Sequence, residues 1–492
     1  MIKSQKKFTL CRAKYLIPLA APDRSLRIED GFVLAEGESI KEVGKFTEEI
    51  GKRILEQCGS ELKVIGSKGV DIPMLEGILM PAFVKAHGHD HEQPIIGVAK
   101  DQPLTEWLDH AVNPFTGFIN GNREELCKDL GMSPQLATYR MARVCDIHYG
   151  ITSCMVHHCN HNKYHFREIA LANEAAGTTM IVAIGGQDRN YVEDLLDKPE
   201  EALGRLDEAI SLPNLKRTSF CPGPDQLFSN SRKVLVPLKE WARKHQTLFH
   251  IHSSEEPKTT EWFKKEIEPG KTPVEYAQEI GILDEYSVLA HQVNCGPNDL
   301  QILAETGTRI VHNPLANTIL GSGMPPVIEM LEGGIPVAIS TDGSGSADNQ
   351  NIIAAARLAA QYQKAKHQNA RLLKSQQLLE MITSVPAGIL RMNQGELASG
   401  KQADWIVLGL GRPNMIPTRL DNLMENIIWA ADGSEIDLVV ARGKVLKRKG
   451  KVMPFSDGST AEEICAAVQT LSEKFAKHME TAPEISGTGA HK

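Results

Sequence analysis

The chain has 492 residues, of which 41% are hydrophobic, 24% charged and 5% aromatic, a composition typical of soluble globular proteins. No segment reaches the roughly 18 uninterrupted apolar residues of a membrane helix, and the opening MIKSQKKFTL lacks the apolar core of a signal peptide. The 54 basic and 62 acidic residues give a net charge of -8 that is spread along the chain, which argues against a nucleic-acid partner. We therefore expect a cytoplasmic enzyme with neither a nucleic-acid nor a membrane partner.

Short runs with partial alternation of apolar and polar residues occur at both ends of the chain, separated by turn residues. Such runs predict the strands of a small antiparallel sheet or sandwich. In the later group, Gly443-Lys444 predicts a hairpin turn, and the basic run 447–449 is interpreted as a solvated edge. We expect residues 1–75 and 395–456 to form one β-sandwich domain together.

Between these ends, short apolar runs alternate with amphipathic segments of helix length. The runs predict buried strands at 77–86, 151–158, 178–186, 217–223, 247–252, 287–291, 308–314 and 336–342. This alternation predicts an α/β fold, a distorted TIM (β/α)8 barrel, over residues 76–394. Residues 457–492 are expected to add a C-terminal helix and a polar tail.

Nine cysteines are scattered along the chain and form no CxxC pair. Neither a disulfide framework nor a zinc ribbon is therefore expected. We interpret the cysteines as reduced thiols in a reducing compartment.

Polar residues end several of the predicted strands. The first strand ends in His87-Gly88-His89, the fifth in His250-Ile251-His252, the sixth in His291 and the eighth in Thr341-Asp342. Because the carboxyl ends of barrel strands meet at one mouth, these side chains are expected to lie close together. Alternation along a strand puts residues i and i+2 on one side, so His87 and His89 can bind one ion. Three imidazoles and one carboxylate suit Zn²⁺ or Fe²⁺.

Glu255 follows His252 by three residues, at the start of the loop after the fifth predicted strand. A carboxylate beside a metal-bound water can take a proton from that water and pass it to a leaving group. A hydrolytic metal enzyme needs a residue in this role, so Glu255 is a candidate catalytic residue.

Several stretches resemble the amidohydrolase superfamily, in particular its deaminase and chlorohydrolase branch. They are PAFVKAHGH, DQPLTEWL, HIHSSEE, LAETGTRIVHNPLANTILGSGMPPV, VAISTDGSGSADN and, nearer the C-terminus, GELASGKQADWIVL and VVARGKVLKRKGKV. The resemblance covers nearly the whole chain.

The resemblance implies that one metal ion is bound by His87, His89, His252 and Asp342. The family's spacing from the preceding proline selects His87 rather than a ligand set shifted to His91. The predicted third and fourth strands offer no acid that could bridge a second metal, so we expect one divalent ion per chain. Zn²⁺ is the first expectation and Fe²⁺ the alternative, because such ligands accept both.

The resemblance also implies roles in the reaction for three residues. Glu255 matches the proton shuttle of the deaminases, and His291 matches the residue that orients the attacking water and contacts the tetrahedral centre. Asp342, besides binding the ion, is expected to accept a proton from that water.

Five further residues are candidates for substrate binding. Trp107 resembles the family's apolar lining behind the first loop, and Asn317 and Leu320 match a loop that flanks the substrate. Thr116 stands where adenosylhomocysteine deaminases place an acid that holds ribose hydroxyls, which argues against a nucleoside substrate. His158 belongs to a cluster of histidines after the second strand; a pocket wall or a solvated loop is preferred there over a second metal site.

Together these residues predict a metal-dependent aminohydrolase that deaminates a small nitrogen heterocycle of the purine, pterin, pyrimidine or triazine type. Metal-bound hydroxide would attack the carbon that carries the amine, while Glu255 protonates the adjacent ring nitrogen. The alternatives are hydrolytic dechlorination or alkylamine removal on an s-triazine-like ring, and a non-catalytic oligomeric homologue. The resemblance further implies a homo-oligomer, a dimer or larger.

Overall fold

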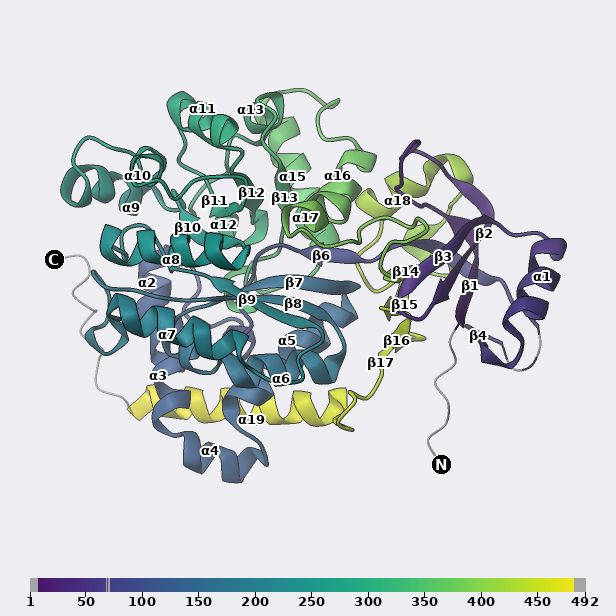
Figure 1. Cartoon of the computed structure of the whole chain (residues 1–492), viewed down its shortest axis with the longest axis horizontal. Coiled ribbons are helices and arrows are strands. Elements are labelled where there is room, and N and C mark those ends of the chain that lie inside the picture. The colour runs from purple at the N-terminus through teal and green to yellow at the C-terminus, as the bar shows by residue number, and fades with distance from the viewer. Residues whose placement is uncertain (1–7, 68, 70, 482–492) are drawn as a thin grey trace.

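The computed structural model describes residues 8–67, 69 and 71–481. Two parts of the structure are visible in Figure 1. A barrel surrounded by helices forms one end of the molecule, and a mixed sheet forms the opposite end. The polar tail predicted at 482–492 lies outside the described residues.

The mixed sheet unites the two ends of the chain. Its strands are β1 (Phe8–Leu16), β2 (Ile28–Glu36), β3 (Ser39–Lys45), β4 (Leu62–Val64), β5 (Leu75–Pro81), β14 (Trp405–Gly409), β15 (Ile436–Ala441), β16 (Lys444–Arg448) and β17 (Lys451–Val452). They lie in the order β17-β16-β15-β14-β5-β1-β2-β3, with β4 beside β1. Alternate residues of β1 serve two apolar clusters: Leu10 packs with Ile54 of α1 (Glu48–Cys58), and Cys11 packs with Trp405. The predicted β-sandwich built from both termini is therefore confirmed.

The barrel consists of two parallel four-stranded sheets. One holds β6 (Phe83–Lys85), β7 (Ile151–His158), β8 (Thr179–Ile184) and β9 (Thr218–Pro222), and the other holds β10 (Phe249–Ser253), β11 (Ser287–His291), β12 (Arg309–His312) and β13 (Val337–Ile339). The sheets meet through a bridge between Gln226 and His252 at one seam, and through hydrogen bonds between Ser340 Oγ and the His87 backbone at the other. Each predicted barrel strand has a counterpart, and the predicted α/β fold, a distorted (β/α)8 barrel, is confirmed.

The predicted first strand, 77–86, is wrong in one respect, because it is two strands. Pro81, which lacks an N–H group, ends β5 in the mixed sheet. The Ala82 amide then donates to Asp404 O in the mixed-sheet region, and the Phe83 amide donates to Gly150 O beside β7. The chain changes sheets between these two residues. The limit of 75 for the N-terminal β segment stays a prediction. The limits 76–394, 395–456 and 457–492 stay predictions.

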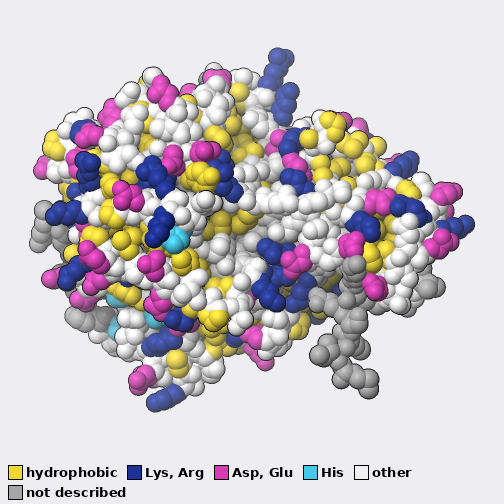
Figure 2. Space-filling view, in the orientation of Figure 1, with side chains coloured by type: hydrophobic (Ala, Val, Ile, Leu, Met, Phe, Trp, Pro, Cys, Tyr) yellow, Lys and Arg dark blue, Asp and Glu magenta, His cyan; other side chains and the backbone are white. Residues whose placement is uncertain are grey.

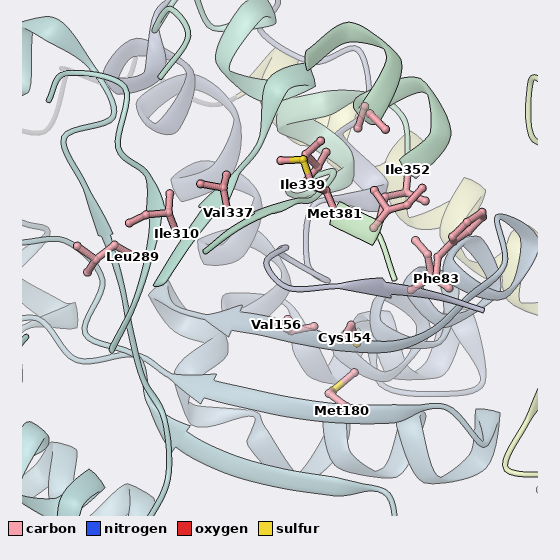
Figure 3. Packing of buried hydrophobic residues seen from close by; sticks show 14 of the residues in the cluster. Phe83, Cys154, Val156, Met180, Leu289, Ile310, Val337, Ile339, Ile352 and Met381 are labelled. Atoms are coloured by element: carbon pink, nitrogen blue, oxygen red, sulfur yellow. The ribbon is translucent and has the colours of Figure 1, made fainter. Parts of the chain in front are cut away.

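Alternation along the barrel strands separates two apolar layers. Cys154 and Val156 of β7 join the large cluster that reaches the surrounding helices, where Ile352 and Met381 lie (Figure 3). Met155 between them belongs to a second cluster inside the barrel. The same parity on β7 sends His157 inward and His158 outward, where the His158 ring lies 5.3 Å from that of Tyr139.

Helices cover the outside of the barrel (Figure 1). The α-helices are α2 (Leu104–Trp107), α3 (Asn113–Gly121), α4 (Arg123–Leu130), α5 (Pro134–His148), α6 (Phe166–Ala176), α7 (Pro199–Ile210), α8 (Arg232–His245), α9 (Pro257–Trp262), α10 (Pro273–Glu279), α11 (Pro297–Thr306), α12 (Pro314–Ile319), α13 (Val327–Glu332), α14 (Ser344–Ala347), α15 (Ile352–Lys366), α16 (Ser375–Met381), α17 (Ser384–Ile389), α18 (Leu423–Trp429) and α19 (Ala461–Thr481). Shorter helical turns are η1 (Gly59–Glu61), η2 (Gln93–Ile95), η3 (Leu108–Val112), η4 (Asn160–Tyr164), η5 (Glu193–Leu195), η6 (Phe263–Ile267), η7 (Pro413–Met415) and η8 (Leu420–Asn422). None of the helices within the described residues is long and apolar enough to cross a membrane.

The C-terminal β region differs from its prediction in two details. The turn between β15 and β16 is Arg442-Gly443, one residue earlier than predicted, since Ala441 pairs with Lys444. Both turn residues have positive φ, and a Cβ on Gly443 would lie 2.3 Å from Gly37 O. The sequence predicts Lys447 in a solvated edge, but it is buried, because β16 packs against α5 and Lys447 Nζ donates to His148 O at the end of that helix. Elsewhere, acidic and basic side chains are interspersed over the visible surface (Figure 2).

Candidate active site

A pocket opens at the carboxyl ends of the barrel strands. Seven of the residues that the sequence singled out line it: His89, Trp107, His252, Glu255, His291, Leu320 and Asp342. The pocket therefore brings together residues that lie up to 253 positions apart in the chain.

The predicted metal ligands converge at this pocket. His87 Nε2 lies 3.2 Å from Asp342 Oδ1, and His89 Nε2 lies 3.6 Å from the same oxygen. His89 Nε2 also lies 3.2 Å from His252 Nε2. Donor atoms bound to one Zn²⁺ at about 2.0–2.2 Å are separated by about 3–3.5 Å, so these spacings suit a single ion.

Each imidazole of the site has an oxygen or nitrogen partner for its Nδ1 atom. His89 Nδ1 lies 3.1 Å from His157 O, and His252 Nδ1 lies 2.7 Å from Asp225 O. His87 Nδ1 lies 2.7 Å from His250 Nε2. These contacts direct the Nε2 atoms toward the centre of the site, where His87 Nε2 is buried and makes no hydrogen bond with the described chain.

Burial lowers the pKa of His87, His89 and His252 below the ordinary value, and for His87 and His89 the neighbouring imidazoles add to this effect. The neutral imidazole is the form that binds a metal. Three neutral imidazoles and a carboxylate, with the three Nε2 atoms directed at one centre and that of His87 without a hydrogen-bond partner in the described chain, therefore fit a divalent cation such as Zn²⁺.

The backbone that carries the ligands differs from the predicted strand geometry. β6 ends at Lys85, so His87 and His89 lie in the following loop, and the alternation argument for them was wrong. The loop is held by a buried ionic network in which Arg143 of α5 donates to both oxygens of Asp90, the residue after His89. Lys85 Nζ joins this network through Asp146 at 2.8 Å. On β10, in contrast, the predicted alternation holds: Phe249 and Ile251 pack outward, and the two histidines face the barrel interior.

Glu255 and His291 lie beside the ligand set. His291 Nε2 is 3.5 Å from Glu255 Oε2 and 3.6 Å from Asp342 Oδ2. Burial, together with the Asp342 carboxylate, raises the pKa of Glu255 well above its ordinary value, which suits a carboxyl group that delivers a proton near neutral pH. His291 and Asp342 both adopt left-handed backbone conformations, with φ of 76° and 70°.

The five predicted substrate-binding residues are placed differently. Trp107 and Leu320 line the pocket. Asn317 Oδ1 accepts a hydrogen bond from His291 Nδ1 at 2.8 Å. Thr116 is buried and donates to Asn113 O, and His158 packs on α5; neither is among the pocket-lining residues of the described chain.

Sequence reasoning missed several polar residues of the pocket: Glu92, Asn160, Tyr191, Asp225, Gln226 and Ser346. Glu92 Oε2 accepts hydrogen bonds from Gly345 N, Ser346 N and Ser346 Oγ, and thereby fixes the turn after Asp342. Asp225 Oδ1 lies 3.5 Å from His157 Nε2. Asp225 and Gln226 follow the carboxyl end of β9, so the same rule that selected Asp342 could have found them.

The model of the Amidohydrolase family matches residues 78–446. The chain belongs to the amidohydrolase family. A 5-methylthioadenosine/S-adenosylhomocysteine deaminase of Thermococcus sibiricus is 30% identical to this amidohydrolase over 86% of this chain and 94% of the relative. A 5'-deoxyadenosine deaminase of Methanosphaera stadtmanae is 28% identical over 91% and 99% of the two chains.

Solved structures share the fold of this amidohydrolase. A zinc-bound adenosine deaminase from Xanthomonas campestris aligns with a TM-score of 0.80 at 19% identity, over 95% of this chain and 98% of that chain. The zinc complex of an atrazine chlorohydrolase from Arthrobacter aurescens aligns with a TM-score of 0.77 at 20% identity, over 94% and 100%. The amidohydrolase is a hydrolase acting on C–N bonds, which confirms the predicted family and reaction class.

Proposed function

We propose that this amidohydrolase deaminates an amino-substituted nitrogen heteroaromatic ring. Water adds to the ring carbon that carries the amine, and ammonia leaves. The observation that carries the proposal is the convergence of Glu255, His291 and Asp342 beside three further metal-ligand side chains on the floor of one pocket.

In this proposal His87, His89, His252 and Asp342 hold one divalent ion, with Zn²⁺ as the first choice and Fe²⁺ as the alternative. Such an ion, when bound, lowers the pKa of water toward neutrality. The donor set and its spacing support one ion per chain.

The protein side chains manage the protons. Asp342 Oδ2 takes a proton from the attacking water and passes it to the amine, which leaves as ammonia. The Glu255 carboxyl protonates the ring nitrogen next to the reacting carbon and regains a proton from the added hydroxyl group as the ring carbonyl forms. His291, 3.5 Å from Glu255, stabilises the tetrahedral centre by hydrogen bonding.

The pocket lining favours a substrate without phosphate or carboxylate groups. Among the described residues, no pocket-lining side chain is a lysine or an arginine, whereas Glu92, Asp225, Glu255 and Asp342 are acidic. Trp107 and Leu320, with apolar neighbours, offer a surface on which a flat ring can stack. An anionic substituent would have no basic side chain to pair with there.

The sequence favours a free base over a nucleoside on the identity of Thr116 alone, and Thr116 is buried outside the pocket lining of the described chain. The two curated relatives are named for deamination of adenosine-type nucleosides, so nucleosides belong in any substrate panel. Thr116, His158 and Asn317 were predicted as substrate contacts, but none of them is among the pocket-lining residues of the described chain, and they are not part of this proposal.

We further propose a cytoplasmic homo-oligomer, a dimer or larger. All nine thiols are free, which agrees with a reducing compartment. Ile416, Leu420 and Trp429 expose 68%, 37% and 38% of their surface around α18, and such apolar surface is suited to a subunit contact.

Hydrolytic removal of halide or alkylamine from an s-triazine ring is the second candidate. Halide leaves without a proton, whereas an amine leaves only after protonation, so a buried acid at position 255 favours an amine leaving group. The structural match to the atrazine chlorohydrolase shows the shared fold alone.

The test is ammonia release by Zn²⁺-loaded protein from aminopurines, pterins, aminopyrimidines, adenosine-type nucleosides and aminotriazines, with chloride followed for halogenated rings. We expect ammonia release from at least one uncharged member of this panel. We also expect kcat/KM to be at least 100-fold lower for a nucleoside 5'-monophosphate than for its nucleoside. An unpaired phosphate charge in the pocket should raise the free energy of the transition state by about 3 kcal/mol. If chloride is released from a halogenated ring and no ring in the panel releases ammonia, the proposal of deamination is overturned.

A further inference from the structure

The nearest Nδ1 partner of each site imidazole falls into one of two classes. For His89 and His252 it is a backbone carbonyl oxygen, at 3.1 and 2.7 Å, with Cys159 Sγ and Asp225 Oδ1 farther away at 3.9 and 3.8 Å. For His87 and His291 it is a side chain, His250 and Asn317 respectively. Side-chain partners can be replaced by mutation, so the orientation of these two imidazoles is open to experiment.

His250 has only one way to satisfy both of its contacts when it is neutral. Its Nδ1 atom lies 2.9 Å from Val288 O. A carbonyl oxygen only accepts hydrogen bonds, so Nδ1 of His250 carries the proton and Nε2 carries a lone pair. That lone pair accepts from His87 Nδ1 at 2.7 Å, which leaves the lone pair of His87 on Nε2, the atom that lies 3.2 Å from Asp342 Oδ1.

The position of His250 suits this indirect role. It is fully buried on β10 and is not among the pocket-lining residues of the described chain, so its effect on the site passes through His87. His252, two residues further along the same face of the strand, is itself a proposed ligand. One strand therefore supplies one ligand and the support of another.

Asn317 bears the same relation to His291. It is fully buried on α12, and its Oδ1 atom accepts from His291 Nδ1 at 2.8 Å. The lone pair of His291 is then on Nε2, which can accept a hydrogen bond from a donor placed between Glu255 and Asp342. This Nε2 atom lies 3.5 Å from Glu255 Oε2 and 3.6 Å from Asp342 Oδ2.

We propose that His250 and Asn317 are positioning residues with separate effects: His250 sets the tautomer of His87 and thereby the metal affinity, and Asn317 sets the tautomer of His291 and thereby the reaction step. The inference rests on the proposed function, because it takes His87 as a metal ligand. Partners that hold a metal-bound imidazole typically contribute about 10–100-fold to affinity or activity.

The experiment measures Zn²⁺ affinity of the full-length chain by chelator competition, with circular dichroism as the control for folding. We expect His250→Phe, which keeps a ring but offers no acceptor, to weaken Zn²⁺ binding by about 10–100-fold. His250→Gln places an amide oxygen near the position of Nε2 and is expected to restore most of the affinity. Asn317→Leu is expected to leave the affinity unchanged and to lower kcat at constant KM.

A His87→Ala variant distinguishes a failure of the proposed ligand set from a failure of the positioning role of His250. Suppose that His87→Ala abolishes tight Zn²⁺ binding. If folded His250→Phe then binds Zn²⁺ like the wild type, or if His250→Gln loses as much affinity as His250→Phe, the tautomer role of His250 is overturned. If His87→Ala binds Zn²⁺ like the wild type, the proposed ligand set itself is wrong. A raised KM at unchanged kcat in Asn317→Leu would make Asn317 a substrate contact and overturn its role on His291.

Discussion

At the scale of single residues, the site depends on what burial does to charge. Glu255 exposes 4% of its surface, and burial with the nearby Asp342 carboxylate raises its pKa well above the ordinary value. Burial lowers the pKa of His291. A protonated acid and a neutral imidazole therefore face each other, a combination in which the acid gives a proton and the imidazole accepts a hydrogen bond.

Glu255→Gln tests the proton transfer. Glutamine keeps the shape of the side chain and can donate a hydrogen bond, but it cannot release a proton, so kcat should fall about 10²–10⁴-fold. Metal content, measured by atomic absorption, should stay at the wild-type level. Glu256→Gln is the matched control: Glu256 is also buried, at 4% exposure, but does not line the pocket, and its variant should keep most turnover. Normal deamination by Glu255→Gln would remove Glu255 from the mechanism.

At the scale of elements, buried charges tie strands and loops to the helices around them. Arg143 of α5 and the acids Asp90 and Asp146 form such a link to the ligand loop. Lys447 of β16 forms another, since its Nζ donates to His148 O at the end of α5 at 2.6 Å. Burial lowers the pKa of Lys447 to about 8, which shows that its charge is costly in the folded state.

This cost predicts how stability depends on pH. Between about pH 8 and 10.5 the unfolded chain binds more protons at Lys447 than the folded chain, so the free energy of unfolding should rise with pH there, by up to about 3 kcal/mol. Lys447→Met keeps the apolar stem and removes the charge. Its stability relative to wild type should therefore be highest near pH 7.5 and decline toward pH 10.5 in urea unfolding experiments. Lys449→Met at an exposed position is the control for the loss of a surface charge. A stability difference between Lys447→Met and the wild type that does not vary with pH would contradict the prediction.

At the scale of the whole molecule, the C-terminal helix α19 packs against the segment that forms the apolar wall of the pocket. α19 runs along the base of the molecule beneath α3 and α5 (Figure 1). Its Phe475 ring lies 5.2 Å from Phe115, and both belong to one buried cluster with Trp107 and Leu320. Ser472 Oγ donates to Pro94 O, close to the ligand loop. The C-terminal helix thus supports the pocket wall from behind.

Phe475→Ala should affect both stability and substrate binding. Removal of a buried phenylalanine costs about 3–5 kcal/mol of unfolding free energy, and the loosened wall should raise KM while metal content stays constant. Phe220→Ala on β9 is the matched control, because Phe220 is equally buried at 4% but packs against Phe166 on the far side of the strand. It should lose stability without a change in KM. Equal KM values in the two variants would show that α19 does not shape the pocket.

Local patterns in the sequence were enough for the order of elements and for most of the candidate site. Strand periods and turn residues predicted the barrel strands and the return of the C-terminus to the β domain, because these signals depend on neighbours a few residues apart. His87, His89, His252, Glu255, His291 and Asp342 were found because each ends or closely follows a buried strand, and barrel topology brings such positions to one mouth.

Other features depend on contacts between distant segments, and only the tertiary structure decided them. The passage from one sheet to the other at Ala82 depends on Asp404, more than 300 residues away. The burial of Lys447 depends on α5, and the support of the pocket wall depends on α19. Likewise, His250 and Asn317 resemble any buried polar residues until the partners of their nitrogen and oxygen atoms are known. A sequence specifies its local periods directly, whereas the partner of a buried polar group is fixed only when the fold brings both together.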